Sequence, residues 1–394
     1  MFRTKGTYKT QDSRLKTQEE KGKTDSILPP PSSLLPFFCL VSCVFFCLAC
    51  FPASGAEKYA GEFLNLGVGA RPLGMGGSFV AIADDATATY WNPAGLGGLD
   101  RTEIAFMHSS LFGLDSYDFL NYVQPLSGVG TFGLSWIRLG IDDIPMTTLK
   151  SSGSMSASNR PYIYGYMQDT ENAFVLSYGR RFSGDIQWHR HPARDSHQSE
   201  GTDPLPITRY SSLQIGGNAK FLYNSVSGVA RNAIGLGGDV GLIWKASFIS
   251  GEDDAKTGDL SLGIAIQDFL KTRIIWNTTT SPSHTDIIPP NLKIGAAYSR
   301  QIPSIASQVL LSMDADTRYG LEMHYGIEYV LGDVLSLRVG VQEQNLTAGA
   351  GLHIAFVRGG SSVETRHAVS LLVDYAFLSH ELGNTHRISL MTKF

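Results

Sequence analysis

From Arg101 to the end of the chain, hydrophobic and polar residues alternate with a period of two. The odd positions of segment 321–329 carry Leu, Met, Tyr, Ile and Tyr, whereas its even positions carry Glu, His, Gly and Glu. Segments 335–342 and 368–377 follow the same pattern. Because successive side chains of a strand point to opposite faces, this period predicts β-strands with one apolar face and one polar or small-residue face.

About fourteen segments carry the pattern over roughly ten residues each, the length that a membrane-crossing strand needs. Their connections at 127–128 and 331–333 are tight, whereas 141–170 and 270–289 are predicted to be long loops. The connection at 183–207 is also long, so it is either an insertion or conceals a further strand. The predicted strands lie near residues 102–110, 116–125, 129–140, 171–182, 210–225, 230–246, 258–268, 290–300, 306–316, 320–330, 334–343, 346–357, 365–377 and 385–394.

The stretch Gly67–Leu96 lacks this period and is rich in glycine. Glycine permits tight or left-handed backbone that other residues resist. Asp84 is predicted to cap a short helix over Asp85–Trp91, because its carboxylate can accept the unpaired N–H groups of a helix start. Asn92 is biased away from helix by Pro93, and Pro93 can begin a second helical turn. We interpret the stretch as a plug inside a barrel made by the rest of the chain.

Two other interpretations of this stretch are weaker. One is a glycine-rich loop and helix at the start of a soluble domain. The other is a dinucleotide-binding loop, but Arg71 and Pro72 follow Gly67 and Gly69 where that motif needs a helix.

The composition favours a membrane barrel over a soluble domain. Hydrophobic residues make up 43% of the 394 residues and charged residues only 17%, with 42 glycines. Seven of the 32 basic and four of the 36 acidic residues lie within the first 33 positions, so the rest carries 25 basic and 32 acidic residues, a net charge of −7. This acidic balance argues against a nucleic-acid partner, which requires basic patches.

The amino terminus is typical of a secretory signal peptide with an extended basic region. The apolar run 34–52 follows a basic segment and precedes the small residues 54–56, which fit a cleavage site. A single transmembrane anchor is disfavoured by Pro36 and Pro52. All four cysteines lie in this run, so the mature chain has no disulfide framework or thiolate metal site. We therefore predict an all-β protein with a signal peptide at 1–56, a plug at 57–100 and a transmembrane antiparallel β-barrel at 101–394.

The plug stretch resembles the amino-terminal signature of a superfamily of outer-membrane β-barrels that includes FadL-type fatty-acid transporters and PorV-type proteins. It is most similar to an uncharacterised spirochaete family of FadL-like outer-membrane proteins. The resemblance implies a fourteen-stranded barrel with an amino-terminal hatch. The matching segments are 69–77, 84–88, 90–96, 262–268, 290–298 and 382–390.

Three groups of residues are candidate functional positions. The final strand ends on an aromatic residue, the form that the barrel-assembly machinery recognises, and its apolar face carries Ile388, Leu390 and Phe394. The plug motif consists of Gly69, Gly74, Gly76, Gly77, Asp84, Asp85, Asn92 and Pro93. The polar strand faces predict that these side chains point into the lumen: Lys220, Asp239, Lys293, Asp314, Glu322, His324, Glu328, Arg338, Asp374 and Arg387.

No set of nucleophile, base and acid stands out, so we expect neither an enzyme nor a cofactor. His189, His191 and His197 lie in a polar stretch that favours a solvated loop over a metal site. In the outer membrane, the FadL resemblance implies uptake of hydrophobic or amphipathic small molecules such as long-chain fatty acids, by hatch movement and lateral exit. The expected partners are the lipid bilayer, the assembly machinery and a hydrophobic ligand, with the barrel a monomer. The alternatives are a non-transporting barrel for protein export or surface attachment, as the PorV resemblance implies, and a surface-exposed structural antigen.

Overall fold

The computed structural model describes residues 60–394 apart from 112, 114, 185–206, 229–230, 250–255, 278–283, 343, 358–367 and 381–382. The predicted signal peptide and the three histidines of the polar stretch lie outside the described residues. So does most of the long connection at 183–207.

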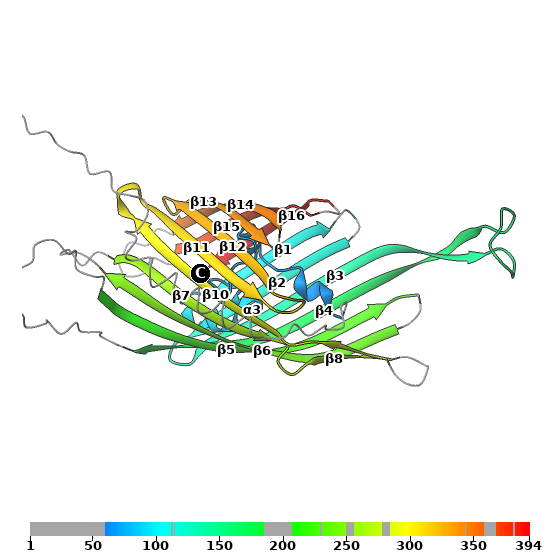
Figure 1. Ribbon diagram of the computed structural model, residues 1–394, viewed down its shortest axis with the longest axis horizontal. Helices are drawn as coiled ribbons and strands as arrows, with labels where there is room; N and C mark the ends of the chain where they lie inside the picture. Colours follow the sequence, from blue (N-terminus) through cyan, green and yellow to red (C-terminus); the bar gives the residue numbers. More distant parts are fainter. Residues whose placement is uncertain are drawn as a thin grey trace, which may run out of the picture. The chain divides into compact units, whose positions relative to one another are not determined.

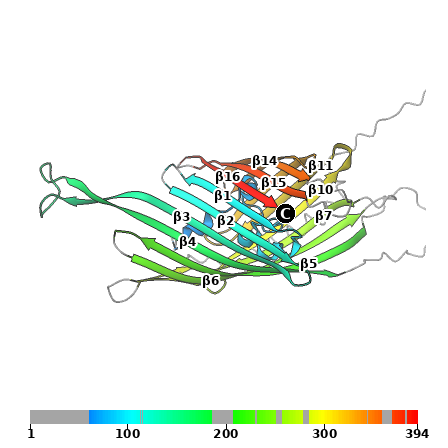
Figure 2. The same ribbon diagram turned by 180° about the vertical axis from the view of Figure 1, so that it is seen from behind.

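Fourteen antiparallel strands close into a barrel, which confirms the predicted fold class and strand number. The ring closes where β1 pairs with β16, with Glu103 opposite Lys393 (Figure 2). The strands of the ring are β1 (Glu103–Leu111), β2 (Asp115–Leu126), β3 (Gly130–Leu149), β4 (Pro161–Gly184), β5 (Ile207–Val226), β6 (Arg231–Ile249), β7 (Lys256–Gln267), β10 (Asn291–Ile302), β11 (Ser307–Asp316), β12 (Glu322–Leu331), β13 (Leu335–Gln342), β14 (Asn345–Val357), β15 (Ala368–Leu378) and β16 (Thr385–Lys393).

The two ends of the barrel differ. We call the end where β1 begins and β16 ends the proximal end, and the opposite end the distal end. At the distal end β3 and β4 project past their neighbours, because β2 reaches only Ile141 of β3 and β5 reaches only Asp169 of β4 (Figure 1). A short 3-10 helix, η3 (Pro303–Ile305), connects β10 to β11 at the proximal end.

Two predicted loops contain strands, so these predictions were wrong. Residues 141–149 and 161–170 continue β3 and β4, and the pairing shifts register between Ile141 and Ile144, where Asp143 has a φ of 56°. This bulge interrupts the period of two, which is why the pattern conceals the strand. Within 270–289 a short hairpin, β8 (Thr272–Trp276) and β9 (Thr285–Ile288), pairs with the distal part of β6.

The barrel wall has an apolar outer face. In β1, Ile104 and Phe106 are exposed, whereas Met107 and Ser109 are buried, and β16 alternates in the same way. Outward-facing aliphatic and aromatic side chains are the lipid-facing surface of a transmembrane barrel.

The lumen holds the segment 60–99, which we call the plug. It packs its large apolar side chains, such as Leu73, Met75 and Phe79, against the wall with almost no exposed area. Among the described residues, no helix is long and apolar enough to cross a membrane. The short helices of the plug are η1 (Glu62–Asn65), α2 (Ala70–Gly74), α3 (Ala88–Trp91) and η2 (Pro93–Gly98).

Candidate functional site

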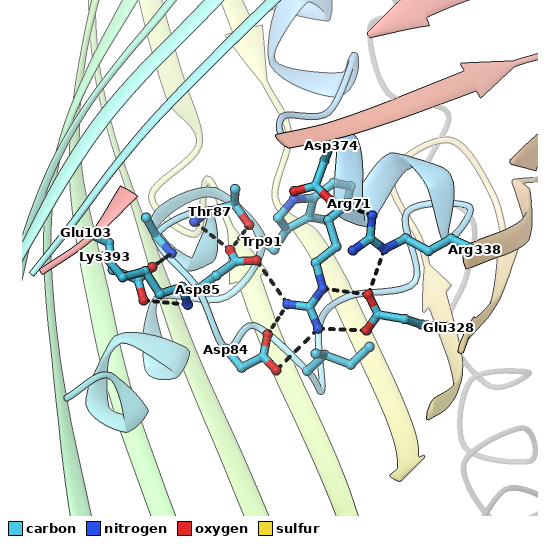
Figure 3. A network of polar contacts seen from close by, with 12 residues as sticks. Arg71, Asp84, Asp85, Thr87, Trp91, Glu103, Glu328, Arg338, Asp374 and Lys393 are labelled. Atoms are coloured by element: carbon cyan, nitrogen blue, oxygen red, sulfur yellow. Dashed lines mark hydrogen bonds and ion pairs between the residues drawn. The ribbon is translucent and has the colours of Figure 1, made fainter. Parts of the chain in front are cut away.

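Arg71 of α2 is the main ionic link between the plug and the wall (Figure 3). Its guanidinium contacts Asp84 at 2.5 Å and Asp85 at 3.1 Å within the plug, and donates to both carboxylate oxygens of Glu328 on β12 at 3.0 and 2.9 Å. Two parallel N–H···O bonds fix both position and orientation of the carboxylate. The plug therefore cannot shift at this point without breaking both hydrogen bonds from Arg71 to Glu328.

A second arginine, which belongs to the wall, also contacts Glu328. Arg338 of β13 donates to Glu328 at 2.7 Å and to Asp374 of β15 at 2.6 Å. All three side chains are nearly inaccessible to solvent. A separate pair, Lys393 and Glu103, forms at 2.7 Å where the ring closes, and Glu103 also accepts the backbone N–H of Ala86. The closing strands are thus bound to the plug as well as to each other.

Asp84 does not cap a helix, so that prediction was wrong. The helix starts at Ala88, and Asp84 pairs with Arg71 instead. The neighbouring Asp85 makes the local hydrogen bonds before this helix instead. Its carboxylate accepts the backbone N–H and the hydroxyl of Thr87 at 2.9 and 2.5 Å. Burial raises the pKa of Asp84, but the adjacent Arg71 outweighs burial and holds this pKa well below its usual range.

The Asn92–Pro93 turn forms as predicted. Pro93 is the first residue of η2, and the Asn92 side chain accepts the N–H of Ala94. The same side chain donates to the carbonyl oxygen of Val80 at 2.9 Å, so it joins two parts of the plug. Asn92 is fully buried, and this network accounts for its polar side chain.

Plug and wall backbones approach each other without intervening side chains. A β-carbon added to Gly340 of β13 would overlap the backbone nitrogen of Gly76, and one added to Gly76 would lie 2.6 Å from the carbonyl oxygen of Val341. Gly76 also has a φ of 67°, which other residues rarely adopt. Inward-facing glycines of the wall therefore leave the space in which the plug backbone packs.

Of the predicted lumen residues, several others contact the plug directly. His324 lies 2.8 Å from the carbonyl oxygen of Gly76, and Asp314 accepts the N–H of Val80 at 2.7 Å. Glu322 is partly exposed at the distal start of β12. In the plug motif, Gly69, Gly74 and Gly77 are buried, whereas Ile388, Leu390 and Phe394 of the last strand are exposed on the outer face.

A second ionic cluster lies in the distal lumen. Lys220 of β5 contacts Asp239 of β6 at 2.7 Å and Asp268 at 2.5 Å, and Arg318 contacts Asp268 at 3.0 Å. Burial raises the pKa of Asp268, but the two cations outweigh burial and hold it below its usual range. Nearby, Lys293 pairs with Asp316 at 2.8 Å, and its ammonium lies 5.7 Å from the centre of the Trp91 ring.

Apolar side chains also line the distal lumen, and Leu64 and Ile137 border the same small pocket as Lys220. Phe119, Ile137 and Leu222 line the wall there, and Phe63 and Leu64 of η1 pack into the same hydrophobic cluster. The plug thus presents an apolar segment to the distal side and a charged one, around Arg71, to the proximal side.

Arg387 of β16 lies beside this apolar region and is only 3% exposed. Its guanidinium donates to the carbonyl oxygen of Gly67 at 3.2 Å and lies 5.5 Å from the centre of the Tyr117 ring. No carboxylate of the described chain pairs with it, and its Nε and the Tyr117 hydroxyl lack a hydrogen-bond partner there. Burying a charge without a counter-ion is costly, so Arg387 differs from every ionic cluster described above.

On the proximal side of the plug the lumen is open and polar. A cavity of about 770 Å³ lies between the plug and the proximal end, and most of the residues that line it are serine, glutamine or charged. Lys245 of β6 reaches across to donate to the carbonyl oxygen of Ile82 at 3.2 Å. The charged residues on this cavity include Arg71, Asp84, Arg181, Lys245, Asp259, Glu328 and Lys393.

Several of these residues were missed from the sequence. Arg71 lies within the recognised motif, but its partner Glu328 is 257 positions away, and no local pattern joins them. Arg318 follows the end of β11 in a predicted turn, where a charged residue normally faces solvent. The sequence pattern could have predicted the role of the wall glycines. Gly340 falls on the polar, lumen-facing side of its strand, where a missing side chain leaves room for the plug.

Comparisons with known proteins give one family model and a set of similar solved structures. The model of the uncharacterised protein family UPF0164 matches residues 52–167. No curated protein matches the chain.

Two toluene transporters and a FadL homologue are among the similar solved structures. The Ralstonia pickettii toluene transporter TbuX aligns at 9% identity with a TM-score of 0.43, over 83% of this chain and 97% of that one. The Pseudomonas aeruginosa FadL homologue aligns at 11% identity with a TM-score of 0.43, over 83% of this chain and 98% of that one. The P. putida toluene transporter TodX aligns at 10% identity with a TM-score of 0.40, over 83% of this chain and 98% of that one. None of these likenesses assigns a ligand to this chain.

Proposed function

We propose that this barrel takes up hydrophobic or amphipathic small molecules, such as long-chain fatty acids, across a bacterial outer membrane. The observation that carries the proposal is Arg387, a buried cation without a carboxylate partner among the described residues, next to apolar side chains of the distal lumen. A molecule with a carboxylate and an alkyl chain complements both features. The carboxylate accepts from Arg387 and Tyr117, and the chain lies against Phe119 and Ile137.

The plug controls access to this position. Phe63 and Leu64 pack in the same apolar cluster, so a ligand enters only when η1 moves aside. The charged cavity on the proximal side offers an alkyl chain no favourable environment, because transfer of apolar surface into water is unfavourable. The proposal therefore places the distal end towards the cell exterior and has the ligand leave sideways through the wall rather than along the barrel axis.

Binding of palmitate and of hexadecanol to the purified full-length barrel tests this function. Hydrogen bonds to a charged group contribute about 1.5–3 kcal/mol, so Arg387→Leu is expected to weaken palmitate binding roughly tenfold or more. Hexadecanol lacks the carboxylate and should bind equally well to both forms. Arg180→Leu is the matched control, because Arg180 lies on the outer face beside Phe182.

A correctly folded barrel that binds neither ligand contradicts the proposed function. Folding is checked independently by the heat-dependent gel migration of the barrel. Equal weakening of both ligands by Arg387→Leu would show that this arginine holds the plug rather than a carboxylate.

One observation favours attachment to a protein partner as a second function. The projecting β3–β4 hairpin exposes Tyr162, Tyr164 and Tyr166 beyond the rest of the barrel. Aromatic residues are enriched at the centres of protein interfaces. Replacing the three tyrosines by serine should then abolish retention of a surface protein on cells while leaving palmitate binding unchanged.

A further inference from the structure

The outer wall has a groove of about 600 Å³ at its distal end, where β7 stops and β8 runs beside β6. Its floor and sides are apolar. Ile234 and Leu236 of β6 and Ile275 of β8 point outward into it, and Leu270 closes it at the turn before β8. Leu236 and Leu270 are 71% and 67% exposed, well above the exposure of most outward-facing aliphatic residues of this wall. We call this feature the outer groove.

Two cations border the outer groove. Arg273 pairs across the sheet with Leu236, and Lys271 lies at the end of the turn, directly before β8. Both are exposed, and no acidic side chain of the described chain pairs with either one. Their positive charge is therefore available on a surface that otherwise faces lipid.

The turn that ends at Lys271 and leads into β8, the strand of Arg273, is held from inside the barrel. The Asp268 carboxylate contacts Lys220 and Arg318 and accepts the hydroxyl of Thr272 at 2.8 Å. The backbone N–H of Lys271 donates to the carbonyl oxygen of Asp268 at 2.8 Å, and that of Phe269 donates to Gly238. A buried ionic cluster thus fixes the position of the groove rim, so the groove is formed before anything binds.

We propose that the outer groove binds an anionic phospholipid of the surrounding membrane. One acyl chain lies along Ile234, Leu236 and Ile275, and the phosphate contacts Lys271 and Arg273. The volume lies within the roughly 300–1,000 Å³ of small-molecule sites. Charge complementarity selects the lipid, because basic side chains at the edge of a lipid-facing surface attract anionic headgroups.

Native mass spectrometry of the full-length barrel, equilibrated with equal amounts of dioleoylphosphatidylglycerol and dioleoylphosphatidylcholine, tests this site. The wild type is expected to retain the anionic lipid preferentially. Each cation contributes about fivefold, so the Lys271→Gln/Arg273→Gln double variant should lose roughly twenty-five-fold in affinity for phosphatidylglycerol. Arg180→Gln, which removes a cation from the same outer face near the proximal end, should leave the preference unchanged.

A second variant distinguishes the contribution of the acyl chain to lipid binding from that of the headgroup. Leu236→Ser should weaken retention of both lipids while the preference for phosphatidylglycerol remains. Equal retention of the two lipids by the wild type, or an unchanged preference in the double variant, overturns the proposal. Displacement of bound phosphatidylglycerol by millimolar inorganic phosphate also overturns it, because the site would then be an ion site rather than a lipid site.

Discussion

Buried arginines on the two sides of the plug have opposite kinds of surroundings. On the proximal side, Arg71 and Arg338 are each paired with carboxylates, and the polar cavity gives the network access to water. On the distal side, Arg387 is buried beside apolar side chains with only a carbonyl oxygen and an aromatic ring as partners. The proximal arginines and the distal clusters around Asp268 and Asp316 are paired with opposite charges, whereas Arg387 has no ionic partner within the described chain.

The difference shows which contacts hold the plug and which are available to a ligand. Removing one partner of a buried ion pair leaves the other charge uncompensated, so such pairs resist rearrangement. Apolar contacts such as those of Phe63 are non-directional, and a ligand of similar character can replace them. We therefore expect the plug to stay attached at Arg71 while η1 moves.

Deleting residues 61–99 should have the largest effect, because it joins the two sides of the lumen. Small barrels of eight strands are filled by their own side chains, whereas wide ones of 16–18 strands leave an aqueous channel. A fourteen-stranded wall without its plug should conduct ions in planar bilayers, where the intact protein stays closed. Unchanged conductance of the folded deletion variant would show that segment 60–99 does not block the lumen.

Replacing Arg71 by Ala should have the next largest effect and test the proximal side alone. Glu328 and Asp85 would each lose a cation, and breaking buried pairs costs about 3–5 kcal/mol. Amide hydrogen exchange across 67–99 should accelerate accordingly. Arg387→Leu is the matched comparison, and it should change the exchange rates little or slow them, because it removes a buried charge that has no ionic partner. Similar acceleration in both variants would abolish the distinction between the two sides.

The smallest effect is expected from pH and concerns the contact between Asp84 and Arg71. Because Arg71 lowers the pKa of Asp84 below its ordinary 3.8, the pair stabilises the plug above that pH, and the stabilisation disappears as the pH falls towards the folded-state value. The Asp84 side chain is 44% exposed, so solvent screening limits the contribution to under about 1 kcal/mol. Hydrogen exchange of the plug at pH 7 and pH 3 should differ more in the wild type than in Asp84→Asn. Equal differences would mean that other carboxylates carry the pH dependence.

The wall was predictable from the sequence because lipid on one side forces a period of two on every crossing strand. The prediction was wrong where this constraint ends. Beyond Ile141 the chain projects from the barrel and bulges at Asp143, and β8 and β9 are too short to establish a period. The presence of a plug followed from its different pattern, but its attachments did not.

Those attachments depend on strand register, which the alternation leaves undetermined. Asp84 lies where a helix cap is expected, yet the guanidinium of Arg71 offers its carboxylate a stronger partner than unpaired N–H groups. Arg71 reaches Glu328 only because β12 is placed so that its carboxylate lies at the level of α2. A charged residue on the polar face of a strand is thus predictable as a lumen residue, but its partner is not.

The close approach of Gly340 to Gly76 also limits the order of assembly. A wall that touches the plug backbone leaves no clearance through which the plug could be threaded into a finished ring. Pairing of β1 with β16 must bring together the first and last strands of the barrel, and loop-closure entropy makes such distant contacts late. The segment made first must therefore already lie inside the curved sheet when its edges meet, so that the plug serves as the template on which the wall closes.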